Sequence, residues 1–238
     1  MARLRLTQPS AAQPTLSERS ASAVDLGVVL AVFLMCSSIE PVLDPLLRRG
    51  HGLPGVLEMA GYQFACEGLA LCVVLAVRHE RPSTYGFTRS KLAWSLGLGL
   101  LFAMILDLAL SYHVGALLWI PLRRHSATRM ALALGFPMSV AGLAITVTVW
   151  GVVEAFFGVF FARKLNVALG HNGHGWRSPG ASGFALFNGV IHLLIGQGMA
   201  GFLTSFASGY AIAVIPALTG NAWGSALVQT LTNAAGKA

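Results

Sequence analysis

Long apolar segments recur along almost the whole chain, and they restrict its fold more than any other feature. A helix needs about 20 apolar residues to cross the hydrocarbon core of a bilayer. Only 11% of the 238 residues are charged, whereas a soluble domain has about 25%. The sequence therefore predicts an all-α, polytopic transmembrane helical bundle. About seven helices are expected, near 23–46, 55–77, 92–118, 130–166, 181–197, 200–216 and 221–235. The range is six to eight, because short glycine-rich joints blur the last boundaries.

The ends and loops suggest one membrane domain behind a polar tail. Residues 1–22 are rich in Ser, Gln, Pro and Ala, which predicts a disordered tail. Residues 23–238 are expected to form a single transmembrane domain. With seven spans, ten of the sixteen Lys and Arg residues fall on the side of the tail. The positive-inside rule then favours a cytoplasmic N-terminus in the cytoplasmic membrane, with membrane lipids as partners.

The net charge of +7 does not indicate a nucleic-acid-binding protein. The basic residues fall in the tail and in short loops, as topology determinants do. They do not form a stripe with interleaved aromatic residues.

The fourth apolar segment, residues 130–166, is too long for a straight crossing. At about 1.5 Å per residue it exceeds a hydrocarbon core of about 30 Å. It is expected to tilt, kink or project, with Pro137 and Gly151 as candidate bends. Small residues such as Gly97 and Gly99 are expected to allow close helix packing.

Three of the apolar segments carry polar side chains that a lipid-facing helix avoids. Glu154 lies in one, Asn188 and His192 in another, and Gln229 and Asn233 in the last. Each pair is four residues apart and so shares one helix face. A charge at the bilayer centre costs about 2.5–3.5 kcal/mol on insertion scales. These groups are therefore expected to meet inside the bundle as a candidate functional site.

Each of these groups has a structural and a catalytic interpretation. A buried carboxylate, a core histidine and interhelical amides can simply hold helices in register. In a catalytic site, Glu154 could act as a general base on water. Gln229 and Asn233 could donate hydrogen bonds to an oxyanion without carrying charge. Spacing alone leaves both interpretations open.

The order of these groups resembles the CPBP intramembrane protease family, which includes CAAX prenyl endopeptidases and bacteriocin-processing membrane proteins. The family's Glu-Glu-x-x-x-Arg motif falls on Val153, Glu154 and Gly158. Its Phe-x-x-x-His motif falls on Asn188 and His192. Its His-x-x-x-Asn motif falls on Gln229 and Asn233. Residues 219–223 look like the lead-in to the last motif. The resemblance covers about residues 80–238, with a CPBP-like core at about 130–235.

The resemblance implies an intramembrane endopeptidase that cleaves a peptide or lipidated protein near the membrane surface. Glu154 and His192 would activate water, Gln229 and Asn233 would stabilise the oxyanion, and Asn188 would support them. The family's first Glu is Val153 here, and its second His is Gln229. Adjacent helix positions point about 100° apart, so Glu154 can replace the missing Glu only through a local twist.

These departures keep two other hypotheses open. One is a catalytically inactive protein of the same fold that binds a peptide or a partner, as an immunity or scaffold protein does. The other is a small ion-coupled transporter that uses intramembrane acids such as Glu67, Asp107 and Glu154 as a relay. His113 is a further ionisable group without an assigned role.

The family is often described as metalloproteases, so zinc is a possible cofactor. Of the motif residues, Glu154 and His192 are the candidate ligands. A catalytic zinc usually takes three protein ligands. We therefore expect no tightly bound zinc.

Overall fold

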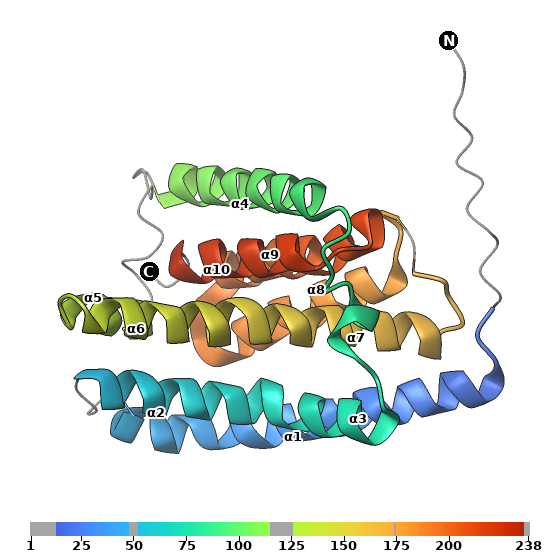
Figure 1. The fold of residues 1–238 in the computed structure, drawn as a ribbon, viewed down its shortest axis with the longest axis horizontal. Helices are drawn as coiled ribbons and strands as arrows, with labels where there is room; N and C mark the ends of the chain where they lie inside the picture. The colour runs from blue at the N-terminus through green and yellow to red at the C-terminus, as the bar shows by residue number, and fades with distance from the viewer. Residues whose placement is uncertain (1–12, 48–51, 115–125, 174, 236–238) are drawn as a thin grey trace, which may run out of the picture.

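The computed structural model describes residues 13–47, 52–114, 126–173 and 175–235 (Figure 1). All regular secondary structure in these residues is helical, which confirms the predicted all-α bundle. Five helical stretches of the described residues are long and apolar enough to cross a membrane. The protein is therefore a helical membrane protein.

The helices run roughly along the long axis of the molecule (Figure 1). Helix α4 lies at one edge in this view, and α1, α2 and α3 lie at the opposite edge. The closest packing is between α8 and α9, between α4 and α10, and between α1 and α7. The α-helices are α1 (Leu16–Leu47), α2 (Gly52–Phe64), α3 (Ala70–Arg78), α4 (Leu92–Val114), α5 (Ser126–Ala133), α6 (Met138–Thr146), α7 (Glu154–Ala168), α8 (Pro179–His192), α9 (Gly198–Thr219) and α10 (Trp223–Ala235).

Helix α1 begins earlier than the hydropathy pattern predicts. The Glu18 amide donates to Thr15 Oγ1 at 3.3 Å, and the Thr15 amide donates to Glu18 Oε2 at 2.8 Å. This reciprocal pair is a capping box, which satisfies amides at the start of a helix. Residues 16–22, placed in the tail by composition, are therefore helical.

Three π-helical segments interrupt the long helices: η1 (Ala65–Leu69), η4 (Val147–Val153) and η5 (Leu193–Gln197). Segment η1 joins α2 to α3, and η4 joins α6 to α7. The predicted 130–166 segment breaks ahead of α6, next to Pro137, and Gly151 lies within η4. Both candidate bend positions thus coincide with irregular backbone.

The last apolar segments fold into a hairpin. Gly196 and Gly198 have φ of 84° and 66°, a region that glycine enters without steric cost. Beyond this turn α9 packs back along α8, where a Cβ at Gly189 would lie 3.0 Å from Phe202 and one at Gly209 would lie 3.2 Å from Asn188. The residues between Pro179 and Thr219 therefore form two helices, α8 and α9, close to the expected segments 181–197 and 200–216.

One end of the bundle gathers the loops 79–91, 169–178 and 220–222, and we call it the loop end. The Ala222 amide donates to the Gly86 carbonyl at 2.8 Å, and Arg163 donates to the Thr84 carbonyl. The loop end carries all the Lys and Arg residues of the described chain except Arg129, namely Arg19, Arg78, Arg81, Arg89, Lys91, Arg163, Lys164 and Arg177.

A buried ion network ties this end together. Lys164, only 5% exposed, bonds Asp25 at 2.9 Å and Glu80 at 2.7 Å. Arg78 bonds Asp25 at 2.8 Å. Burial, and then the hydrogen bond to Glu80, raise the pKa of the Tyr85 hydroxyl above its usual value. The network joins α1, α3 and α7 through side chains whose charges balance.

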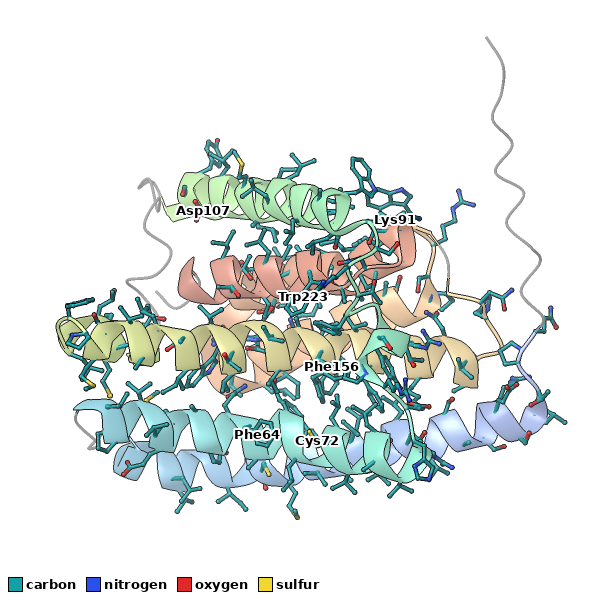
Figure 2. All side chains as sticks on the ribbon, viewed as in Figure 1. Phe64, Cys72, Lys91, Asp107, Phe156 and Trp223 are labelled. Carbon is teal, nitrogen blue, oxygen red and sulfur yellow. The ribbon has the colours of Figure 1, made fainter. Side chains whose placement is uncertain are left out.

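Aromatic rings fill the space between the helix layers. Phe87 packs edge-on against Phe156 and Trp223, with ring centroids 5.0 and 5.3 Å apart. Figure 2 shows Phe156 and Trp223 between α4 and the α1–α3 layer. A second cluster, of Phe33, Phe157 and Phe187, lies deeper and walls the polar cavity described next.

Candidate functional site

A small cavity inside the bundle brings together polar side chains from four helical segments. Glu67 comes from η1, Glu154 from the first turn of α7, Asn188 from α8 and Gln229 from α10. The cavity volume is about 20 Å³, which is room for one water molecule. The walls are apolar, from Phe33, Phe157, Phe184, Phe187, Ile191 and Ile212.

The cavity lies deep in the bundle. Glu154 is the first residue of α7, and Ala168 at the loop end is the last. At about 1.5 Å per residue, these helix ends are about 20 Å apart. Glu67 and Gln229 are buried at this depth, whereas Glu154 and Asn188 are half-buried.

Gln229 lines the cavity from α10. Its side chain is 5% exposed. The amide has a carbonyl oxygen that accepts and an NH₂ group that donates. It can therefore hydrogen-bond to a molecule in the cavity.

Asn188 is held in one orientation. Its Nδ2 donates to the Ser205 carbonyl of α9 at 2.8 Å. This bond fixes the amide plane across the α8–α9 hairpin and leaves Oδ1 as the acceptor on the other side. The Asn188 side chain can therefore orient a donor at the cavity, and it also stabilises the hairpin.

Glu67 entered the sequence analysis only as a possible member of an ion relay, and the structure adds it to the lining of this cavity. It is 6% exposed, and Oε1 accepts a hydrogen bond from Gln63 Nε2 at 2.9 Å. Gln63 and Glu67 are one helical turn apart. That polar pair in an apolar helix was the available signal, but no motif of the protease resemblance included it.

His192 takes a different place. It is the last residue of α8, and its Nδ1 lies 2.8 Å from Gln197 Oε1 across η5. It is not among the residues that line the cavity. The side chain of Asn233 lies outside the described part of the structure. The structure thus brings Glu154, Asn188 and Gln229 together and places His192 beside the hairpin turn.

The π-helical segments adjoin these polar groups. Glu67 lies within η1, Glu154 directly follows η4, and His192 directly precedes η5. A π segment shifts the helix register after it, and such segments are frequent at functional sites. Val153 faces η1, with Cγ1 3.1 Å from a Cβ built at Gly68, while its neighbour Glu154 lines the cavity. The backbone therefore changes register directly before Glu154.

Glycine inside η4 lets α10 come close to this segment. A Cβ at Gly151 would lie 2.1 Å from Thr230 Oγ1. A Cβ cannot stay at that distance, so with a larger residue the Thr230 hydroxyl would have to leave its place, where it donates to the Ala226 carbonyl at 2.7 Å. The glycine thus helps to bring Gln229, one residue before Thr230, up to the cavity.

The donor set of the cavity does not match a zinc site. In the described residues, no group of three or more His, Cys, Asp and Glu side chains is placed to hold a metal ion. Zinc sites use His and Cys with at most some carboxylate. The carboxylates of Glu67 and Glu154 and the amides of Asn188 and Gln229 are oxygen ligands, which suit hard cations.

The other intramembrane groups lie apart from the cavity. Asp107 lies on α4, toward the opposite end from Lys91 (Figure 2), and does not line the cavity. The side chain of His113 is outside the described part of the chain. A relay from Glu67 through Asp107 to Glu154 is not formed by the residues at this cavity.

Comparison of the chain with protein-family models, with curated proteins and with solved structures finds no match. The resemblance to the CPBP proteases therefore depends on the motif residues alone.

Proposed function

We propose that the chain is an intramembrane peptidase of the CPBP type, in which Glu154 activates a water molecule held at the cavity. The observation that carries this proposal is the shared cavity of Glu154 and Gln229, which has room for one water molecule between a carboxylate and a buried amide. The substrate would be a peptide or lipidated protein in the cytoplasmic membrane, and the N-terminus of the enzyme would be cytoplasmic.

The chemistry follows from the groups at the cavity. Glu154 takes a proton from water as the water oxygen attacks the peptide carbonyl carbon. Gln229 donates a hydrogen bond from its amide nitrogen to the oxyanion that forms, and Asn188 Oδ1 accepts a hydrogen bond from the second O–H of the water, whose proton stays on the attacking oxygen. When the tetrahedral intermediate collapses, Glu154 passes its proton to the leaving amine.

The missing first Glu of the family motif is the main argument for the inactive alternative. In that case the fold binds a peptide or partner and Glu154 has a structural role. The π segment η4 supports the catalytic hypothesis, because such a segment shifts the register of the helix after it, and Glu154 directly follows η4 and lines the cavity.

Protein termini in cells distinguish the two hypotheses. A strain without the gene is complemented with wild type, with Glu154→Gln or with Glu58→Gln, and its protein termini are compared by mass spectrometry. Glu58 is an exposed carboxylate on α2 and serves as the matched control. Wild type and Glu58→Gln should restore specific cleaved termini, and Glu154→Gln should not. If Glu154→Gln restores them equally, the peptidase mechanism is wrong.

A second candidate function is a cation-coupled transporter, favoured by the two carboxylates at one cavity. Two carboxylates and two amide oxygens can replace the hydration shell of a small cation such as Na⁺. The test is the melting temperature of the purified protein in NaCl and in choline chloride. A sodium-dependent rise that is lost in Glu67→Gln and kept in Glu58→Gln supports this function; equal melting temperatures in both salts reject it.

A further inference from the structure

A second, larger pocket opens at the loop end, away from the polar cavity. Its volume is about 410 Å³, within the range of about 300–1,000 Å³ typical of small-molecule sites. One wall is apolar and comes from α7 and α9, with Val159, Ala213 and Pro216. The opposite rim is polar, with Arg163, His171 and Asn172. A molecule that fills this pocket must be amphiphilic.

The pocket is positively charged because Arg163 is not neutralised. Its Cζ lies 5.4 Å from the centre of the Tyr85 ring, and it donates to the Thr84 carbonyl. These contacts orient the guanidinium without cancelling its charge. Among the described residues Arg163 makes no ion pair, and the described lining contains no Asp or Glu.

The acidic side chains of the ion network already form ion pairs with other cations. Lys164 and Arg78 bind the carboxylates of Asp25 and Glu80 at 2.7–2.9 Å. A second cation, Arg19, lies close to Gly170, which adjoins the lining residue His171, and its Nε donates to the Ala168 carbonyl at 3.2 Å. The local charge therefore favours an anion in the pocket.

Exposed tryptophans place the loop end at the membrane–water interface. Trp94, Trp176 and Trp223 are 63%, 53% and 37% exposed. Trp94 is in the first turn of α4, Trp223 begins α10, and Trp176 is in the loop 169–178. Tryptophan gathers at the level of the lipid headgroups. The pocket thus opens where headgroup phosphates lie.

We propose that this pocket binds the phosphate-bearing headgroup of an anionic phospholipid. Arg163 forms a forked pair of hydrogen bonds with the phosphate, a geometry that guanidinium provides and ammonium does not. His171 and Asn172 complete the polar rim, and the wall of Val159, Ala213 and Pro216 holds the glycerol and first methylenes. The proposal concerns a site separate from the cavity and does not depend on hydrolysis.

The test uses the purified full-length protein and native mass spectrometry with phosphatidylglycerol. Wild type should retain one lipid per protein. Arg163→Gln should weaken retention by about tenfold or more, as expected for the loss of a charge-assisted hydrogen bond. Arg177→Gln, an exposed arginine in the same loop region but outside the lining, should leave retention unchanged.

A second variant tests the pocket independently, in case Arg163→Gln does not fold. Ala217→Leu adds volume to the apolar wall without touching the arginine, and should also lower retention. Unchanged retention in both variants would overturn the proposal. The same measurement is made with sn-glycerol 3-phosphate at the same concentration. If it is retained as well as phosphatidylglycerol, the acyl chains contribute nothing to binding and a lipid is not the occupant.

Discussion

The closest contact between α4 and α10 gives a sharp test of the fold that brings Gln229 to the cavity. A Cβ at Gly224 would lie 2.0 Å from the carbonyl oxygen of Ser95, whereas ordinary contact begins at 3.4 Å. The carbonyl is backbone, so in Gly224→Ala the two helices must separate by about 1.4 Å. Such overpacking costs about 1–3 kcal/mol. For a chain of this length that is a fall in melting temperature of about 2–12 °C.

The two hydrogen bonds at this contact would be strained by the same movement. Ser95 Oγ donates to the Asn221 carbonyl at 2.8 Å and accepts from the Gly224 amide at 2.9 Å. Both bonds are buried, so weakening them adds to the cost of separation. The measured loss should therefore lie in the upper half of the range.

Gly97→Ala is the matched control. It makes the same chemical change on α4, the other helix of this contact, and a Cβ there has no atom within 4 Å. Alanine is favoured over glycine in a helix by about 0.5–1 kcal/mol, so the melting temperature should stay level or rise. Thermal unfolding in detergent, followed by circular dichroism, measures both. Equal melting temperatures for Gly224→Ala and Gly97→Ala would refute the α4–α10 packing.

Three further predictions concern the loop end. Because the pKa of Tyr85 is raised in the folded protein, its unfolded form loses a proton first, near pH 10. Stability should therefore fall above pH 10 by up to about 1.4 kcal/mol per pH unit. Tyr85→Phe should reduce this dependence of stability on pH. Tyr112 is 91% exposed, so Tyr112→Phe should leave it unchanged. Denaturant titrations at pH 9 to 11 measure both variants, and equal pH dependence in the two would contradict the role of Tyr85. Lys164→Met leaves Asp25 and Glu80 with one fewer partner in a buried site, and should cost about 3–5 kcal/mol; a loss under 1 kcal/mol in the same titration would contradict the ion network. Asn221→Asp keeps the bond from the Trp223 amide but loses two donors to Thr88 and Ser90 carbonyls, so its melting temperature should fall; no change would argue against this cap.

The helices themselves could be predicted because hydropathy is local. Each span needs only its own run of apolar residues to be stable in a bilayer. The sequence therefore predicted two separate apolar segments where the structure has the α8–α9 hairpin, with the boundary between them at its glycine turn. The start of α1 was predicted too late because hydropathy detects only apolar residues. The polar residues 16–22 are helical nonetheless, and a capping box stabilises the start of their helix.

The candidate site was predicted only in part. Pairs such as Asn188 and His192 share a face by spacing, yet spacing does not say how far that face extends toward a neighbouring helix. Asn188 bonds to Ser205 and lines the cavity, while His192 bonds to Gln197 at the turn. Which member of a pair reaches a cavity depends on the crossing of helices, which no single segment contains.

The sequence alone determined an all-α membrane bundle, and it indicated that Glu154 and Gln229 should face the interior of the bundle rather than lipid. Only the tertiary structure decided that Glu67 joins them and which way Glu154 points. The π segments that set these directions adjoin close contacts between distant residues, such as Gly151 with Thr230 and Gly68 with Val153. Hydropathy and periodicity act within one helix, whereas a register shift depends on the helix packed against it. The arrangement of the site is therefore a property of the packed bundle.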